Sequence, residues 1–155
     1  MQIQLSQKER MFLEDGKIQE DMCVQKYNNY TQQAQDPELK QLFTKLAGEE
    51  QHHYDVINQL LQGQQPNLSH NQQAQPQPAP TQSNLQGAMN NQTDKLLCTD
   101  LLSTEKYVSN TYDIDVFESA NPAVRQAMQH IQQDEQRHGE ELFNYMNSHG
   151  MYTVK

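Results

Sequence analysis

One set of four residues occurs twice in this chain, and the two copies are 85 positions apart. Each copy has a glutamate, a tyrosine 7 positions later, and a Glu-x-x-His motif that begins 30 positions after the first glutamate. The members are Glu20, Tyr27, Glu50 and His53 in the first copy and Glu105, Tyr112, Glu135 and His138 in the second. One Glu-x-x-His motif is common by chance in glutamate-rich helices, whereas two copies with the same upstream residues form a specific pattern. Four carboxylates and two imidazoles in this spacing are what a four-helix bundle uses to hold two adjacent iron or manganese ions.

Composition indicates a single soluble domain that spans residues 1–155. The chain has 155 residues, which is long enough to bury a core without disulfides. Its formal net charge of -9 provides no basic surface for a phosphate backbone, so we expect no nucleic-acid binding. The sequence shows neither a signal peptide nor an apolar run of membrane-spanning length, so we expect synthesis in the cytoplasm and no membrane association. Cys23 and Cys98 lack the CxxC spacing of zinc ribbons and rubredoxin centres, which favours reduced thiols.

The segment from Gln62 to Asn91 is rich in glutamine and contains four of the six prolines. Such a sequence forms neither a helix nor a core. Extended chain spans about 3.3 Å per residue and a helix rises about 1.5 Å, so this segment can run the length of a bundle. The sequence therefore predicts an all-α four-helix bundle made of two helical hairpins joined by a long crossover. The alternative is a disordered tether between two independent hairpins, which is less favourable because two short helices seldom bury enough core.

The second and fourth predicted helices begin with the same signal, a capping side chain followed by proline at the first helical position. These signals are Asp36-Pro37 and Asn121-Pro122. Downstream of each, core-type residues recur at steps of three and four and form one stripe. The stripes are Leu39, Phe43, Leu46, Glu50, His53, Ile57 and Leu60, and Val124, Met128, Ile131, Glu135, His138, Leu142 and Tyr145. The glutamate and histidine of each motif are therefore predicted to face the core.

Glu49 and His52 form a second pair with the same spacing, one position earlier. A stripe through this pair would turn Lys45 and Gln59 toward the core. We therefore favour the pair that belongs to the repeat.

The glutamates of the first and third predicted helices lie at the same depth as those of their partners. The faces that carry them are Phe12, Gly16, Glu20, Cys23, Tyr27 and Tyr30 in a helix from about Ser6 to Gln33, and Leu97, Leu101, Glu105, Val108 and Tyr112. Glu20 and Glu50 each lie about 13 residues from a turn near Ala34 to Asp36, which places both about 20 Å from that turn. In the second hairpin, Glu105 and Glu135 lie equally far from a turn near Ser119 to Asn121. All four glutamates should therefore lie at one level of the bundle.

Four buried glutamates are destabilising unless cations neutralise them or they are protonated. Two divalent ions supply that charge, and carboxylates with one imidazole per ion suit iron or manganese and tolerate zinc. The expected roles are bridging for Glu50 and Glu135, terminal binding to opposite ions for Glu20 and Glu105, and binding of one ion each for His53 and His138. Tyr27 and Tyr112 lie two turns from the terminal glutamates, where they either donate hydrogen bonds to ligand carboxylates or fill the core.

Other polar residues near the pattern are expected to have ordinary roles. Cys23 is expected to be a buried, inert thiol. Asp115 and Asp134 look like polar-face or turn residues. His130 and His149 fall off the stripe and are assigned no role.

The repeated pattern resembles the ferritin-like superfamily, and among its members the rubrerythrins. The second half resembles the Coat F family of spore coat proteins, through Asp100-Leu-Leu-Ser-Thr-Glu105-Lys, Tyr112, the turn Glu118-Ser-Ala-Asn-Pro122 and Gly150-Met-Tyr152. This likeness is good from roughly Asp94 to Tyr152 and looser in the first half. It implies an endospore-forming bacterium, a location in the spore coat, and other spore coat proteins as partners; a homodimer is compatible with it. The sequence lacks the rubredoxin tail of rubrerythrins, which would supply a built-in electron donor.

Two classes of function remain open. The first is a spore coat-associated ferritin-like protein with a di-metal carboxylate site, holding iron or manganese, in the bundle core. The second is a di-metal oxidoreductase of rubrerythrin or manganese-catalase type that acts on hydrogen peroxide or dioxygen, in which the ions polarise the O–O bond. The likeness to coat components favours the first, and the complete set of six ligands keeps the second open.

Overall fold

The part of the chain that the structure describes folds into four long helices. The computed structural model describes residues 2–69 and 91–155, and these ranges contain no strand. The helices are α1 (Gln7–Gln33), α2 (Pro37–Leu61), α4 (Gln92–Glu118) and α5 (Pro122–Ser148). The predicted all-α four-helix bundle is therefore confirmed. None of the described helices is long and apolar enough to cross a membrane.

Each helix begins at a residue whose side chain caps it. Asp36 and Asn121 accept hydrogen bonds from the backbone N–H groups two residues later, at 3.0 and 2.9 Å, and proline follows each of them. Ser6 caps α1 in a capping box, and Asn91 caps α4 through the backbone N–H of Asp94. Because a cap satisfies backbone donors that the helix itself leaves open, these polar side chains fix where each helix starts.

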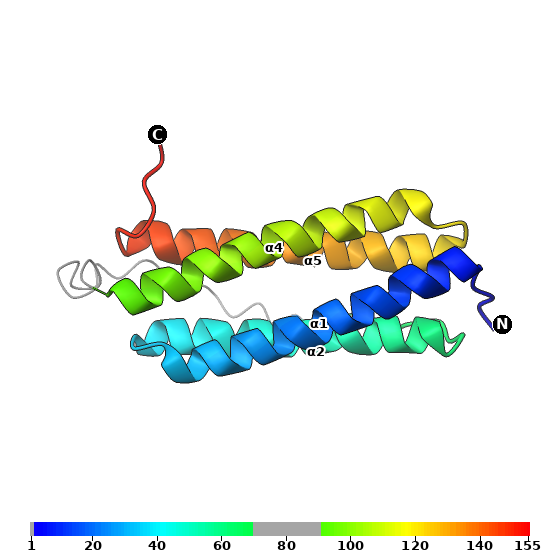
Figure 1. Ribbon diagram of the computed structural model, residues 1–155, viewed down its shortest axis with the longest axis horizontal. Helices are drawn as coiled ribbons and strands as arrows, with labels where there is room; N and C mark the ends of the chain where they lie inside the picture. Colours follow the sequence, from blue (N-terminus) through cyan, green and yellow to red (C-terminus); the bar gives the residue numbers. More distant parts are fainter. Residues whose placement is uncertain (1, 70–90) are drawn as a thin grey trace.

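The four helices form two antiparallel hairpins, α1 with α2 and α4 with α5, packed side by side (Figure 1). Across the hairpins, α1 lies beside α4 and α2 beside α5. Helix α2 ends at one end of the bundle and α4 begins at the other, so the two run in the same direction (Figure 1). This direction is the one that the predicted crossover requires.

The crossover, residues 62–91, falls mostly on residues 70–90, which lie outside the described residues. Its described beginning packs against the bundle more than its polar composition suggested. Pro66 is buried, and Leu68 is half-buried against the apolar core. The carbonyl of Gly63 accepts a hydrogen bond of 2.8 Å from the backbone of Ile3, with Gly63 at a positive φ of 75°. The segment from 62 to 69 is therefore anchored.

A polar layer divides the core into two apolar clusters. One cluster includes Tyr27, Phe43 and Leu142, and the other includes Tyr112 and Met128. A shift of 85 positions converts Tyr27 to Tyr112 and Phe43 to Met128, so the repeat relates one cluster to the other. The two hairpins are therefore related by a pseudo-twofold axis that passes through the polar layer.

Buried acids lock the two hairpins together at both ends of the bundle. Glu9 in α1 accepts hydrogen bonds from the backbone of Ser6 at 2.8 Å and of Asn121, in the opposite hairpin, at 2.6 Å. Asp94, which is 85 positions after Glu9, accepts from the backbone of Gln35 and Asp36 at 2.8 and 3.0 Å. These contacts set the spacing of the hairpins on either side of the polar layer.

Candidate metal centre

The structure brings all six predicted ligands into the buried polar layer. Their ligand atoms fall into two groups in which every pair of atoms lies within 4.8 Å. The groups are Glu20, Glu50, His53 and Glu135, and Glu50, Glu105, Glu135 and His138. All six residues are at most 2% exposed. Each of the four helices contributes one glutamate, and α2 and α5 also contribute the histidines.

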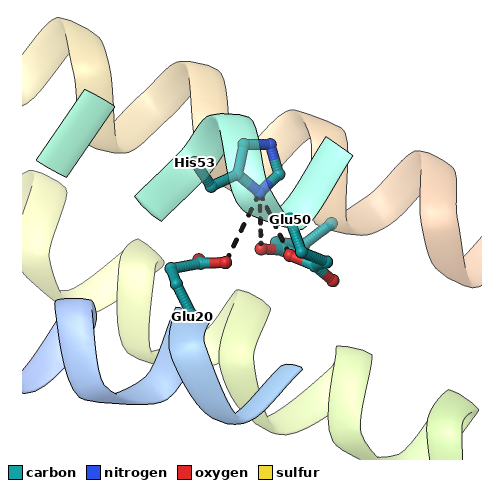
Figure 2. Close-up of side chains that lie close together, drawn as sticks. Glu20, Glu50 and His53 are labelled. Carbon is teal, nitrogen blue, oxygen red and sulfur yellow. Dashed lines mark hydrogen bonds and ion pairs between the residues drawn. The ribbon is translucent and has the colours of Figure 1, made fainter. Parts of the chain in front are cut away.

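The first group is arranged around Nδ1 of His53 (Figure 2). This nitrogen lies 3.2 Å from Oε2 of Glu50, 3.3 Å from Oε1 of Glu135 and 3.8 Å from Oε2 of Glu20. Glu50 and His53 face inward because they are three residues apart on α2 and share its core stripe.

The second group repeats this arrangement around Nδ1 of His138. That nitrogen lies 3.4 Å from Oε1 of Glu50, 3.3 Å from Oε2 of Glu135 and 3.7 Å from Oε2 of Glu105. Glu50 and Glu135 therefore present one oxygen to each histidine. The rings of His53 and His138 stack with centroids 5.5 Å apart.

The chemistry of this donor set fits two cations. Within the described chain, the following buried atoms make no hydrogen bond: Glu20 Oε2, Glu50 Oε1, Glu105 Oε2, both oxygens of Glu135, and His138 Nδ1. Burying such atoms in a dry interior without a hydrogen bond is unfavourable, and several of them here are neighbouring carboxylate oxygens. Divalent ions are the partners that satisfy carboxylate and imidazole atoms together.

Protonation is the other way to neutralise this layer, and the pKa values show its strength. Burial, followed by the charge of Glu50, raises the pKa of Glu20 to about 8. Burial and the same neighbour raise the pKa of Glu135 well above its ordinary value. Burial disfavours the imidazolium ions, but surrounding carboxylates outweigh it and raise the pKa of His53 and of His138. A cation that enters the layer must therefore displace protons.

Two tyrosines connect the hairpins across the centre. The hydroxyl of Tyr27 in α1 donates to Oε1 of Glu105 in α4, and the hydroxyl of Tyr112 in α4 donates to Oε1 of Glu20 in α1. Each terminal glutamate is thus oriented by the opposite hairpin and keeps its other oxygen for the centre. Burial and the nearby carboxylates raise the pKa of both phenols, so both remain donors.

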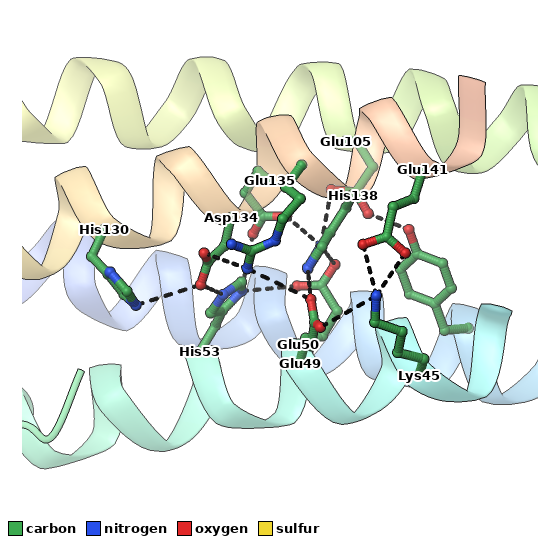
Figure 3. Close-up of polar contacts among 12 residues, drawn as sticks. Lys45, Glu49, Glu50, His53, Glu105, His130, Asp134, Glu135, His138 and Glu141 are labelled. Carbon is green, nitrogen blue, oxygen red and sulfur yellow. Dashed lines mark hydrogen bonds and ion pairs between the residues drawn. The ribbon is translucent and has the colours of Figure 1, made fainter. Parts of the chain in front are cut away.

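Two carboxylates outside the predicted ligand set contact the outer nitrogens of the histidine rings (Figure 3). Nε2 of His53 lies 3.0 Å from Oδ2 of Asp134, and Nε2 of His138 lies 2.6 Å from Oε2 of Glu49. A carboxylate at Nε2 favours a proton on that nitrogen and leaves the lone pair of Nδ1 available to a metal ion. Asp134 was wrongly expected to be an ordinary polar-face residue. Glu49, rejected as an inward-facing ligand, contacts His138 of the opposite hairpin, which is a predicted ligand.

The signal that could have found these residues is the repeat itself, because Glu49 and Asp134 are also 85 positions apart. Around Asp134 the contacts continue toward the surface. Nη2 of Arg137 lies 2.7 Å from Oδ1 of Asp134. Nε2 of His130 lies 3.5 Å from Oδ2 of Asp134 (Figure 3). His130, which was assigned no role, is thus part of the network behind His53.

Cys23 lies beside the centre, but its environment keeps the thiol from ionising. It is 2% exposed, and burial, followed by the charges of Glu50 and Glu20, raises the pKa of its thiol. A thiol that does not ionise is a poor nucleophile and a poor metal ligand. The expectation of an inert, buried thiol is consistent with this environment.

The second hairpin is similar in sequence to a known domain family. Residues 93–155 match the Coat F domain. The match covers nearly all of α4, all of α5 and the C-terminal residues, and it agrees with the resemblance seen in the sequence. No protein of curated function matches the chain.

The fold is also found in a crystal structure of a two-domain protein from Anabaena variabilis ATCC 29413, which contains DJ-1/ThiJ/PfpI-like and ferritin-like domains. The TM-score is 0.71 and the sequences are 17% identical. The similarity covers 97% of this chain and 40% of the Anabaena protein. The fold is therefore ferritin-like. At this identity the likeness concerns the fold alone, because one fold serves many functions.

Proposed function

We propose that this chain is a spore coat-associated ferritin-like protein whose bundle core binds two iron or manganese ions. The observation that carries the metal site is that the two ligand groups share Glu50 and Glu135. A carboxylate that offers one oxygen to each of two groups holds two ions next to each other. The coat association is supported by the match of residues 93–155 to the Coat F domain, which includes Glu105, Glu135 and His138.

Charge balance supports two divalent ions rather than one. The four ligand carboxylates carry four negative charges when ionised, and two neutral imidazoles add none. Two divalent ions bring this buried set to neutrality, whereas one ion leaves an excess that a low-dielectric interior disfavours. The proposed roles are bridging for Glu50 and Glu135, terminal binding for Glu20 and Glu105, and one ion each for His53 and His138.

The residues around the ligands keep them in a binding-competent state. Asp134 and Glu49 hold the outer nitrogens of the two histidines, so each ring turns Nδ1 inward. Tyr27 and Tyr112 fix the terminal glutamates from the opposite hairpin. Iron or manganese bound here would supply Lewis acidity and a change of oxidation state.

The alternative function is a di-metal oxidoreductase of rubrerythrin or manganese-catalase type that acts on hydrogen peroxide or dioxygen. Its favourable observation is the same pair of shared carboxylates, because two adjacent redox-active ions can together exchange the two electrons that a reaction at an O–O bond involves. Its unfavourable observation is burial, since none of the six ligands is more than 2% exposed and a substrate would need a path to them.

Metal content tests the site. Protein purified without chelators or nickel resin should contain about two ions of iron or manganese per chain. Glu50→Ala removes one bridging carboxylate, so both the metal content and the melting temperature should fall together, because binding energy contributes to folding. Glu140→Gln, which changes an exposed glutamate of α5, is the matched control and should retain both. Unchanged metal content in Glu50→Ala would refute the site.

Turnover separates the two functions. Protein loaded with iron or with manganese should be assayed for disproportionation of hydrogen peroxide and for peroxidase activity with an added reductant. Catalytic consumption that His138→Ala abolishes, with the helical circular dichroism retained, would establish the oxidoreductase. Fully loaded protein without either activity supports the coat-associated binding protein.

A further inference from the structure

A second set of metal-ligand side chains lies at the end of the bundle, where α5 ends and α2 begins. Asp36, Glu38 and His149 place one ligand atom each within 4.8 Å of the others. Nε2 of His149 lies 3.5 Å from Oδ2 of Asp36 and 3.4 Å from Oε2 of Glu38. The sequence assigned His149 no role, yet this residue is only 4% exposed.

The hydrogen bond at the other ring nitrogen determines the chemistry of His149. Its Nδ1 lies 2.8 Å from the backbone carbonyl of Tyr145. A carbonyl oxygen only accepts, so Nδ1 carries the proton and donates it. In the neutral ring, Nε2 therefore presents a lone pair to two carboxylates. That arrangement is repulsive unless Nε2 takes up a proton or a cation lies between them, and a backbone carbonyl at Nδ1 is a common partner of metal-bound histidine.

The ligand atoms are held in place before any ion arrives. The ring of His149 stacks on Tyr145 with centroids 3.9 Å apart. The hydroxyl of the same tyrosine donates a bond of 2.6 Å to Oδ2 of Asp36. Oδ1 of Asp36 accepts the backbone N–H of Glu38 at 3.0 Å as the cap of α2. Such outer contacts orient ligands and reduce the cost of binding an ion.

The distances between these groups fit a shared metal ion. A charge-assisted N–H···O bond would bring nitrogen and oxygen to about 2.7–2.9 Å. Ligand atoms on one tetrahedral ion, with metal–ligand distances of about 2.0–2.2 Å, are about 3.3–3.6 Å apart. The observed separations of 3.4 and 3.5 Å match the second case.

We propose that Asp36, Glu38 and His149 form a third metal site, separate from the bundle centre, that binds one zinc ion or a similar divalent transition metal. Two carboxylates and one imidazole provide three ligands, and water completes the tetrahedron. The side chain of Glu38 is 57% exposed, so the fourth position opens to solvent. An ion here fastens the end of α5 to the start of α2 and thus joins the two hairpins.

The pseudo-twofold axis supplies a matched control within the chain. The positions 85 residues after Asp36 and Glu38 are Asn121 and Ala123, so the opposite end of the bundle lacks these carboxylates. The double variant Asp36→Asn with Glu38→Ala copies that end. Asparagine keeps the cap of α2, since it is as good a capping residue as aspartate, so the fold should be retained.

Equilibrium dialysis against micromolar zinc, followed by metal analysis, tests the proposal. The wild-type chain should bind one more zinc ion than the double variant and than His149→Gln. Cobalt should give the intense visible absorption of a four-coordinate ion in wild type and not in either variant. Zinc should raise the melting temperature of wild type more than that of the double variant. Glu140→Gln should match wild type in every measurement.

The central and peripheral sites fail in different ways. Glu50→Ala should lose ions from the centre and keep the cobalt absorption of the peripheral site. His149→Gln should lose that cobalt absorption and keep the ions of the centre. Equal zinc stoichiometry in wild type, the double variant and His149→Gln would overturn the proposal. The same is true if His149→Gln lowers the melting temperature equally with and without zinc, because that result assigns His149 to a simple ion pair.

Discussion

The carboxylates behind the two histidines offer a graded test of the central site. Asp134→Asn and Glu49→Gln each keep the size of the side chain and remove its charge. Each change replaces a charge-assisted hydrogen bond to a ligand histidine by a neutral one, a loss of about 1–1.5 kcal/mol, or roughly tenfold in metal affinity. Outer partners of metal-bound histidine typically change affinity by about 10–100-fold, which brackets this value.

The two variants should not be equal. The side chain of Asp134 is 3% exposed, and that of Glu49 is 21% exposed. Water screens the more exposed charge, so Glu49→Gln should weaken binding by roughly threefold and Asp134→Asn by roughly tenfold or more. Competition with a fluorescent chelator for manganese, under conditions where the helical circular dichroism is unchanged, measures both effects.

Glu141→Gln is the control for this series. Glu141 lies two turns after Asp134 on α5, and its carboxylate contacts Lys45 at 2.8 Å rather than a histidine. The affinity of the Glu141→Gln variant for manganese should equal that of wild type. If all three variants bind equally well, the outer carboxylates do not support the histidines. If Glu49→Gln is the weakest binder, burial does not set the strength of these contacts.

Three further outcomes are expected. Because burial raises the pKa of Glu20 to about 8, protons compete with metal below that pH. The affinity for metal should therefore rise from pH 6 to pH 8, and metal loading should release protons that a pH-indicator dye detects in weak buffer. A metal affinity that does not change with pH contradicts this. Burial and then Asp15 raise the pKa of Asp115 from its ordinary 3.8 to about 7, so the folded state binds the proton more tightly. The stabilising contribution of its protonated form is therefore fully present below pH 4 and is lost as pH rises to 7. In urea unfolding, the free energy of unfolding of Asp115→Asn relative to wild type should be about 1–2 kcal/mol higher at pH 8 than at pH 4, after allowance for screening. Deleting about six residues near Gln75 should lower the melting temperature little, because loop length has a weak effect on stability, and a large drop would show that the deleted residues are part of the core.

The sequence predicted the helix starts and the inward-facing motif residues because both depend on local chemistry. Asp36 and Asn121, each followed by proline, identify helix starts without knowledge of the tertiary structure. The apolar stripe fixes the phase of α2, and it correctly selects Glu50 over Glu49 as the residue that faces the core. A period of 3.6 residues is sufficient for that choice.

Contacts at the edges of the stripe could not be predicted in the same way. Glu49 lies about 100° around the helix from Glu50, at the boundary of the core. Its partner is His138 on another helix, so its role depends on how α2 and α5 approach each other. The roles of the buried Glu9 and Asp94 likewise depend on how the helices approach each other, because their carboxylate oxygens accept hydrogen bonds from backbone N–H groups of the opposite hairpin. The sequence therefore did not predict them.

The crossed hydrogen bonds of the two tyrosines have a consequence for how such a site can be assembled. Tyr27 donates to Glu105 and Tyr112 donates to Glu20, so each hairpin supplies the hydrogen bond that orients a glutamate of the other. Neither hairpin alone contains all of the predicted ligands. A hairpin with one Glu, Tyr and Glu-x-x-His set could pair with an identical copy of itself and satisfy every one of these contacts. The two hairpins of the internal repeat thus correspond to the two subunits of a homodimer, joined in one chain. Because they are joined covalently, the two halves can differ in sequence, as they do at Asp36 and Asn121.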